Sequence, residues 1–418
     1  MLDTNMVAKQ PRNIFILHPS DFLTDHEPHG DGLTAFGFIR ELARRDYRLH
    51  VAARQCSLSS PLPSNVTLYQ LPVRVRVPLL DRVEYMIRAR RLFQRLQYAE
   101  SIEIIHQMNP VFAGLSLAVT GTRVPIVLGT IVPCWPDDPD SLLSRHPLVG
   151  KLLLGIKRVI VGWQQKAAAI LLLTSPAALN RVPYPEAIEH KVMFVPHGID
   201  TEAFSPASPG ERSQSAPTVL FLANLQRRKG IFVLLKAFER VAQAVPGCRL
   251  RIVGSGPESA SVAEQVKRMP CGDQIELVPN VARDRVVTFL RECTVYCLPS
   301  LGEPYGASLV EAMCCGIPVV GTAAGGFPYL VPEGGGRLVP PRNPDALAMA
   351  LIEVLTDEAL QRSMGTVNRD HAVASLSWSR AVDRLEIAYR VAFSQHNVSN
   401  SIIHQAGMPN ASAGDARQ

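Results

Sequence analysis

The sequence lacks the features typical of disulfide-bonded secreted proteins, transmembrane proteins and nucleic-acid-binding proteins. The eight cysteines include no Cys-x-x-Cys pair and lie in apolar surroundings, as is typical of reduced core cysteines in a cytosolic protein. Lysines and arginines interrupt the apolar segment 148–173, so no run reaches the ~20 residues that a transmembrane helix needs. Residues 1–13 are polar, unlike a secretory signal. A net charge of +6 is too small to indicate nucleic acid as a partner. We therefore expect a cytoplasmic protein.

The remaining composition and patterning predict two domains of the α/β class. The chain has 418 residues, of which 47% are hydrophobic and 19% charged, enough to bury two cores. Short apolar strands alternate with amphipathic helices, which favours mostly parallel sheets. The predicted strands are 13–19, 48–53, 102–106, 125–128 and 170–174, then 218–222, 249–253, 275–278, 294–298 and 317–320. The predicted helices are 33–45, 230–244, 259–268, 283–292 and 378–393, with further helical sequence at 343–370.

A segment rich in proline and turn residues, 183–204, marks the expected junction between the domains. We expect one domain over 1–195 and a second over 196–372. A helix at 375–395 is expected to cross back to the first domain, and the polar residues 396–418 are expected to be disordered.

The stretch 298–326 carries the first chemical signal. Glu303 lies in a Gly-Pro loop, a short helix is expected to begin near Ala307, and Glu311 lies on that helix. The first N–H groups of the helix, around Ser308 and Leu309, should lack partners and attract an anion. Carboxylates beside a phosphate suit sugar hydroxyls rather than the phosphate itself. The stretch therefore predicts a site for a nucleotide sugar.

Four motifs occur together in the second half of the chain. They are VPHGID (195–200), NLQRRKG (224–230), GSGPE (254–258) and GEPYGASLVEAMCCGIPVVGT (302–322). This ordered set resembles the retaining glycosyltransferases of family 4. The resemblance implies the GT-B fold, with two Rossmann-like domains facing a cleft between donor and acceptor. It also implies transfer of a hexosyl group from a nucleotide-diphospho-sugar to a hydroxyl acceptor, with retention at the anomeric carbon.

The resemblance assigns roles to individual residues. Glu303 matches the carboxylate that binds hydroxyls of the transferred sugar, helped by the amides of Tyr305 and Gly306. Glu311 matches the carboxylate that binds the ribose, and the amides at the start of its helix match the phosphate contacts. In the implied mechanism the acceptor hydroxyl attacks from the front face, and the leaving diphosphate takes its proton. The backbone near Pro279 matches the contact with the nucleobase, so the donor nucleotide leaves no mark on side chains.

Lys229 matches the lysine that pairs with the diphosphate of the donor. The family usually has an arginine shortly before it in a Gly-Arg pair, where this chain has Ala223 and Asn224. Either Arg227 or Arg228 substitutes for that arginine, or Asn224 binds a phosphate oxygen. Lys229 and the helix terminus take the place of a metal, so no metal or other cofactor is expected.

Two candidates in the first half carry a weaker signal. The loop Gly30-Asp31-Gly32 matches the glycine loop that lets the backbone approach the donor phosphate, with Gly32 as the contact and Asp31 open to a simple turn role. His106, at the end of a strand, is a candidate contact with sugar or acceptor, and the alternative is a structural histidine.

The first half also raises the question of a membrane. Segment 74–98 carries seven arginines among apolar residues at helical spacing, which indicates either a solvated basic face or a surface for anionic lipid or acceptor phosphate. Segment 148–173 predicts a packed helix and strand, the alternative being an interfacial helix. The expected role is polysaccharide or glycolipid assembly at the cytoplasmic membrane face, with a lipid-linked sugar as one acceptor class.

Two rival functions belong to other classes. An NAD-dependent oxidoreductase is disfavoured, because GSGPE lacks the third glycine of the dinucleotide fingerprint. The other rival is a relative without catalytic activity that binds a partner. Its best support is Asn224, which stands where the family usually has an arginine.

Overall fold

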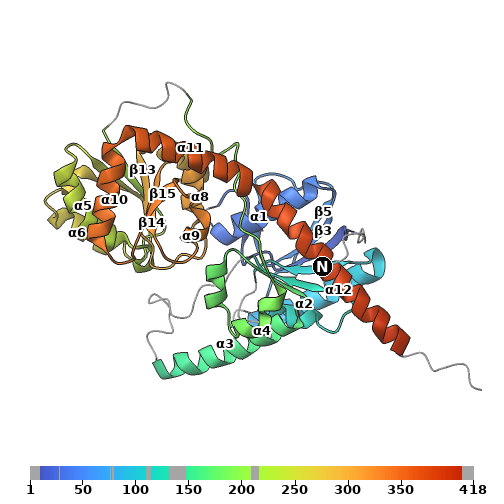
Figure 1. Cartoon of the computed structure of the whole chain (residues 1–418). Coiled ribbons are helices and arrows are strands. Elements are labelled where there is room, and N and C mark those ends of the chain that lie inside the picture. The colour runs from blue at the N-terminus through green and yellow to red at the C-terminus, as the bar shows by residue number, and fades with distance from the viewer. Residues whose placement is uncertain are drawn as a thin grey trace, which may run out of the picture.

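The computed structural model describes residues 10–406 apart from 28, 76, 78–79, 110–113, 131–146 and 209–215. The chain forms two lobes, each built around its own parallel sheet (Figure 1). Within the described residues no helix is long and apolar enough to cross a bilayer. The alternation of strands and helices thus gives the α/β architecture that the sequence predicts.

The first lobe contains a seven-stranded sheet in the order β5-β3-β1-β6-β7-β8-β9, with every neighbouring pair parallel. Its central strands are buried along almost their whole length because helices cover both faces. The strands are β1 (Asn13–Leu17), β3 (Arg48–Ala53), β5 (Val66–Gln70), β6 (Ile104–Gln107), β7 (Ile126–Leu128), β8 (Ile170–Leu173) and β9 (Val192–Phe194). The main helices are α1 (Gly30–Arg44), α2 (Leu80–Glu100) and α3 (Pro147–Ala167), and β2 (Leu23–Thr24) pairs with β4 (Cys56–Ser57).

The second lobe contains a six-stranded sheet in the order β12-β11-β10-β13-β14-β15. The predicted strands at 218–222, 249–253 and 275–278 and the helices at 259–268 and 283–292 are confirmed at those bounds. The strands are β10 (Thr218–Leu222), β11 (Arg249–Val253), β12 (Ile275–Val278), β13 (Val295–Leu298), β14 (Val319–Thr322) and β15 (Gly336–Val339). The helices are α5 (Ile231–Ala244), α6 (Ser259–Arg268), α7 (Arg283–Glu292), α8 (Ala307–Cys314), α9 (Phe327–Leu330), α10 (Pro344–Thr356) and α11 (Glu358–Ser375).

The last helix, α12 (Trp378–Ala406), follows α11 and lies across the first lobe (Figure 1). Its apolar face, including Leu385 and Tyr389, belongs to the same core as β1 and α1. Trp378 fills the corner where the lobes meet, since a Cβ on Gly37 or on Gly198 would fall within 2.4 Å of its ring. The two lobes are therefore joined by a packed corner as well as by the chain itself.

Several element boundaries differ from the sequence prediction, and two of the differences concern the expected site and the expected tail. The helix expected at 33–45 begins at Gly30, because the His29 side chain caps it by accepting a hydrogen bond from the Gly32 N–H at 3.0 Å. The C-terminal helix, expected to end at 395 before a disordered tail, continues to Ala406. The rest of that tail, 407–418, lies outside the described residues.

Candidate functional site

The candidate site lies at the carboxyl edge of the second sheet, where the strand order changes direction. Strands β11 and β12 lie on one side of β10, and β13, β14 and β15 lie on the other. In open α/β sheets ligands bind at this switch point, outside the carboxyl ends of the strands. The turn η5 (Arg227–Lys229) follows β10, and the loop containing Glu303 follows β13. The topology therefore places Lys229 and Glu303 on the two sides of the switch point.

Glu303 is held by cations from the η5 turn. Lys229 Nζ pairs with Glu303 Oε2, and Arg228 Nη1 lies 3.5 Å from the same oxygen. The Glu303 side chain is only 12% exposed, and that of Lys229 14%. Burial alone would raise the pKa of Glu303, but the charges of Lys229 and Arg228 outweigh it and hold that pKa below its usual value. Glu303 is therefore a carboxylate at neutral pH, able to accept hydrogen bonds from hydroxyl groups.

Arg227 and Arg228 take different directions from this turn, which bears on the missing family arginine. Arg227 Nε donates to Glu258 at 2.9 Å and its guanidinium lies over the Phe232 ring, away from Glu303. Arg228 is the one that reaches Glu303. Asn224 is exposed, on the loop after β10. Of the two arginines left open by the sequence, the geometry favours Arg228 as the second cation.

Glycines let the loop around Glu303 pack closely against its neighbours. The Gly326 N–H donates to the Glu303 carbonyl at 2.8 Å, and a Cβ on Gly325 would fall 2.2 Å from that oxygen. Gly306 has φ 83°, in the left-handed region, and forms the N-cap of α8. Within the described residues the amides of Tyr305 and Gly306 have no hydrogen-bond partner, as the proposed sugar contact requires.

The start of α8 differs from the expectation in one respect. The Leu309 N–H donates to the Gly306 carbonyl at 3.0 Å, so this amide is occupied and its assignment as a phosphate contact is corrected. The Ser308 N–H has no partner among the described residues, and the Ser308 Oγ accepts from the Tyr296 hydroxyl at 2.6 Å. Ser308 is therefore the better candidate for the anion contact at this helix terminus.

Glu311 is buried on α8 rather than exposed on a helix surface. It is 3% exposed, and Arg283 Nη1 at the start of α7 lies 2.5 Å from its Oε1. The Arg283 guanidinium also lies 4.7 Å above the Phe204 ring. Burial raises the pKa of Glu311, and the charge of Arg283 opposes that rise. Sequence reasoning missed Arg283, although a basic residue at the first position of a helix was a visible signal.

The first lobe also reaches this loop. Arg181, in the turn η3 (Pro176–Arg181), donates to the Gly302 carbonyl, and the Ser175 hydroxyl lies 3.4 Å from the Pro304 carbonyl. The Tyr305 hydroxyl donates to the His197 carbonyl. The loop that carries Glu303 is therefore held from both lobes. No sequence signal marked Arg181, because it lies far from Glu303 in the chain.

The sequence left His106 either as a contact with sugar or acceptor or as a structural histidine, and the structure favours the second. The residue is 1% exposed, and both ring nitrogens are occupied: Nδ1 lies 2.7 Å from the Tyr389 hydroxyl and Nε2 lies 2.5 Å from the Gly129 carbonyl. Burial lowers the pKa of His106 to about 4. Because a carbonyl can only accept, Nε2 carries the proton of the neutral ring and Nδ1 accepts from Tyr389. His106 ties α12 to the first sheet and is a structural histidine.

Gly32 is also corrected. It lies in the first turn of α1, with its N–H occupied by His29 rather than open to a donor phosphate. A Cβ at this position would fall 2.2 Å from the Phe22 carbonyl oxygen. The close approach that requires glycine here is therefore to the chain's own backbone.

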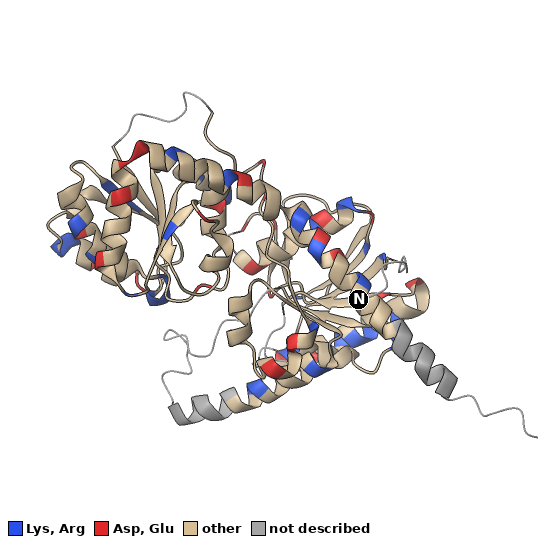
Figure 2. Ribbon diagram, in the orientation of Figure 1, with Lys and Arg blue, Asp and Glu red and all other residues tan. Residues whose placement is uncertain are grey.

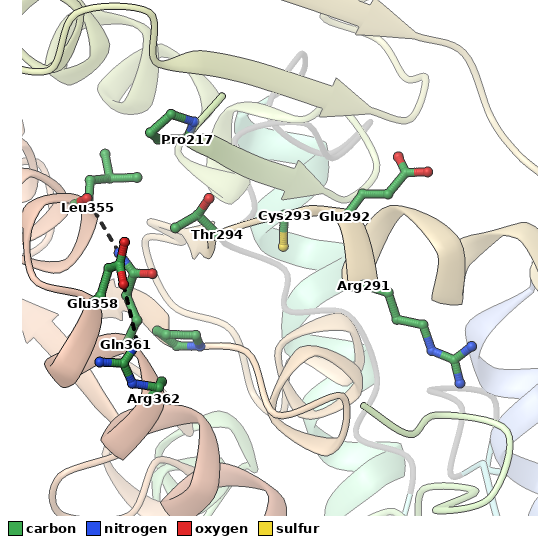
Figure 3. Close-up of a pocket in the computed structure, with 10 residues that line it drawn as sticks. Pro217, Arg291, Glu292, Cys293, Thr294, Leu355, Glu358, Gln361 and Arg362 are labelled. Atoms are coloured by element: carbon green, nitrogen blue, oxygen red, sulfur yellow. Dashed lines mark hydrogen bonds and ion pairs between the residues drawn. The ribbon is translucent and has the colours of Figure 1, made fainter. Parts of the chain in front are cut away.

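A separate pocket of about 350 Å³ lies at the opposite edge of the second sheet. It is lined by residues that precede strands, such as Pro217, Thr294 and Pro318, and by Glu358 and Arg362, which pair across one wall (Figure 3). It is thus not part of the candidate site. The described residues contain no cluster of three side chains suited to a metal ion.

Comparisons with known proteins agree with this geometry. Residues 207–371 match the sequence model of the glycosyl transferases group 1. The chain is 31% identical over 245 residues to a D-inositol 3-phosphate glycosyltransferase of Thermobifida fusca, covering 55% of this chain and 56% of that one. It is 29% identical over 208 residues to the phosphatidylinositol N-acetylglucosaminyltransferase gpi3 subunit of Schizosaccharomyces pombe, covering 50% and 45%. The chain thus spans about half the length of the curated relatives it matches.

Solved structures show the same fold over nearly the whole chain. A sucrose-phosphate synthase from Thermosynechococcus elongatus superposes with a TM-score of 0.68 at 21% identity, covering 95% of this chain and all 100% of that one. Anabaena HepE in complex with UDP and glucose gives 0.64 at 18% identity, covering 94% and 99%. The glycosyltransferase WaaG gives 0.67 at 16% identity, covering 90% and 99%. The fold is GT-B, as the sequence predicts, and residues 207–371 are similar in sequence to the glycosyl transferases group 1.

Proposed function

We propose that this chain transfers a hexosyl group from a nucleotide-diphospho-sugar to a hydroxyl acceptor, with retention at the anomeric carbon. The observation that carries the proposal is the gathering of Lys229 and Arg228 on Glu303 at the switch point of the second sheet. The names of two similar proteins support it, since one is a D-inositol 3-phosphate glycosyltransferase and another, HepE, has been solved with UDP and glucose.

The proposed reaction exchanges one bond to the anomeric carbon for another. The acceptor oxygen attacks that carbon on the face from which the diphosphate departs, and the bond to the β-phosphate oxygen breaks. The departing diphosphate takes the proton of the acceptor hydroxyl, so no protein base is required. Lys229, Arg228 and the Ser308 N–H stabilise the negative charge that develops on the diphosphate, and they supply positive charge without a metal or other cofactor.

The ion pair between Lys229 and Glu303 prepares the site for this donor. When the donor binds, Lys229 exchanges its ion pair with Glu303 for one with the diphosphate. The sugar hydroxyls then donate hydrogen bonds to the Glu303 oxygen that Lys229 has released. Glu311 accepts hydrogen bonds from the ribose. Both carboxylates are already buried and oriented, so little rearrangement is needed when the donor binds.

The experiment is a transfer assay with UDP-, GDP- and ADP-sugars and hydroxyl acceptors, reading the anomeric configuration of the product by NMR. We expect Glu303→Ala and Lys229→Ala each to lower kcat/KM by about 100-fold or more. Arg227→Gln is the matched control, because Arg227 points to Glu258 instead. Turnover that survives both substitutions would refute the site. Nucleotide binding without turnover would support the rival of a catalytically silent binding protein.

The proposed setting is glycolipid or polysaccharide assembly at an anionic membrane surface. Helix α2 exposes Val83 and Ile87 beside its arginines, and α3 exposes Val159 and Trp163, whose exposed fraction is 61%. Both helices pack against the turn η1 (Leu115–Val119), and Lys and Arg residues occur along them (Figure 2). Apolar side chains among cations are typical of surfaces that bind anionic bilayers. Co-sedimentation with phosphatidylglycerol vesicles tests this part, and absence of binding would exclude it.

A further inference from the structure

We propose that Arg283 is a positioning residue of the donor site, which orients Glu311 for the hydroxyl groups of the donor's ribose. The inference rests on the proposed function and adds to it a residue that the motifs do not contain. Arg283 Nη1 lies 2.5 Å from Glu311 Oε1. This contact holds the carboxylate from one side, and we assign its other oxygen, Oε2, to the ribose.

The position of Arg283 at the start of α7 does not stabilise that helix. It is the first residue of α7, and the N-cap, Ala282, offers no side-chain hydrogen bond. A cation at a helix amino terminus opposes the helix dipole and destabilises the helix. The contact with Glu311 and the stacking over Phe204 offset that cost. Arg283 therefore serves the neighbouring helix α8 rather than α7.

Arg283 also lies where it can sense the nucleotide. Its side chain is 35% exposed, whereas that of Glu311 is 4% exposed. Helix α7 begins after the loop 279–282, which follows β12 at the carboxyl edge of the second sheet. Arg283 thus follows a strand on one side of the switch point, and Glu311 lies on α8, which follows β13 on the other side. A ribose bound to Glu311 Oε2 would lie beside the Arg283 guanidinium.

The charge of Glu311 depends on this pair. Burial raises the pKa of Glu311 and Arg283 opposes the rise, so removing Arg283 raises that pKa further. The other titratable groups described around Glu311 are Tyr296 of β13, Tyr305 of the loop and the thiols of Cys314 and Cys315. Burial raises the pKa of each of these four groups, so they stay neutral between pH 5 and 8. A protonated Glu311 accepts fewer hydrogen bonds from a ribose, so nucleotide affinity should fall in acid.

The test is calorimetric titration of the whole protein with UDP, GDP and ADP between pH 5 and pH 8. For Arg283→Gln we expect affinity at pH 6 to fall once the pKa of Glu311 exceeds 6, by about tenfold for each further unit of that rise, with a smaller loss at pH 8. Arg283→Lys should restore part of the affinity, and Arg285→Gln, an exposed arginine on the same helix, should change nothing. The 2′,3′-dideoxy form of the nucleotide that binds should show no dependence on Arg283, because it lacks the hydroxyl groups.

The outcomes separate the two proposals. A wild-type protein that binds none of the three nucleotides overturns the proposed function, and the role of Arg283 with it. Binding by the wild type with the same affinity and pH dependence in Arg283→Gln overturns the role of Arg283 alone. If Arg283→Gln does not fold, the double variant Arg283→Gln, Glu311→Gln removes the unpaired buried charge. It should bind more weakly than wild type and keep only the pH dependence that comes from the terminal phosphate of the nucleotide, and a pH dependence equal to that of the wild type overturns the inference.

Discussion

Replacing His106 by phenylalanine should separate a structural histidine from a catalytic one. Phenylalanine leaves the Tyr389 hydroxyl and the Gly129 carbonyl buried without partners. Each such group costs about 1 to 3 kcal/mol, so we expect a loss of about 2 to 6 kcal/mol in the free energy of unfolding. Tyr389→Phe leaves only one group unsatisfied and should lose about half as much. Urea unfolding measures both losses, with calorimetry as a check because a chain with two lobes need not unfold in one step.

The same substitution has a signature in pH. The pKa of His106 is about 4 in the folded protein, against 6.5 for a histidine in the unfolded chain. The unfolded chain therefore binds the proton more readily, and His106 contributes about 3 kcal/mol of stability above pH 6.5 that is lost as the pH falls to 4. The free energy of unfolding should therefore depend less steeply on pH in His106→Phe over this window. The difference in slope should correspond to up to one bound proton.

A catalytic His106 predicts the opposite pattern. Loss of a general acid or base lowers kcat by about 100-fold or more while leaving stability almost unchanged. If His106→Phe unfolds at the same urea concentration as wild type and turns over at least 100 times more slowly, the structural assignment is wrong.

Three further predictions address the joints between the lobes and the surface. Arg181→Ala should raise the KM for the donor with a smaller effect on kcat, because it loosens the loop at Gly302; initial rates over a range of donor concentrations measure this, and an unchanged KM would contradict it. Gly37→Ala should destabilise the protein by about 1 to 3 kcal/mol, since a Cβ there would lie 2.1 Å from the Trp378 ring; unfolding at the wild-type midpoint would refute that packing. Trp163→Ser should lower binding to anionic vesicles without changing turnover of a soluble acceptor, and equal co-sedimentation of variant and wild type would contradict the proposed surface.

Much of the second lobe could be predicted because its sequence signals are local. Strands such as β10 and β11 are short apolar runs bounded by turn residues, and α8 is delimited by Gly306 and Gly316. The first lobe was harder. The glycines at 30 and 32 favoured a loop, but the side chain of His29 caps a helix there. Strands β5 and β9 of this lobe, and β15 of the second lobe, were missed, since a few residues without alternation carry little periodic signal.

The residues of the candidate site that belong to sequence motifs were predicted, and those that reach it through tertiary packing were missed. The pairing of Lys229 with Glu303 joins two predicted residues. Arg283 reaches Glu311 from another helix, and no spacing in the sequence encodes that contact. His106 was predicted at the site but does not belong to it. A histidine at the end of a strand is well placed to contact a substrate, but the Tyr389 hydroxyl already binds the ring of His106.

The loop at Gly302–Gly306 is where these observations meet, because both lobes hold it. From the second lobe, Lys229 and Arg228 fix the Glu303 carboxylate, while from the first, Arg181 binds the backbone beside it. A donor that draws Lys229 toward its diphosphate removes one of these restraints and leaves the first lobe holding the loop. Occupation of the donor site should then depend on the contact between the lobes. The acceptor, with its attacking hydroxyl, is expected in the first lobe. Through the contact of Arg181 with the loop, the position of the sugar-binding carboxylate Glu303 would then depend on that lobe.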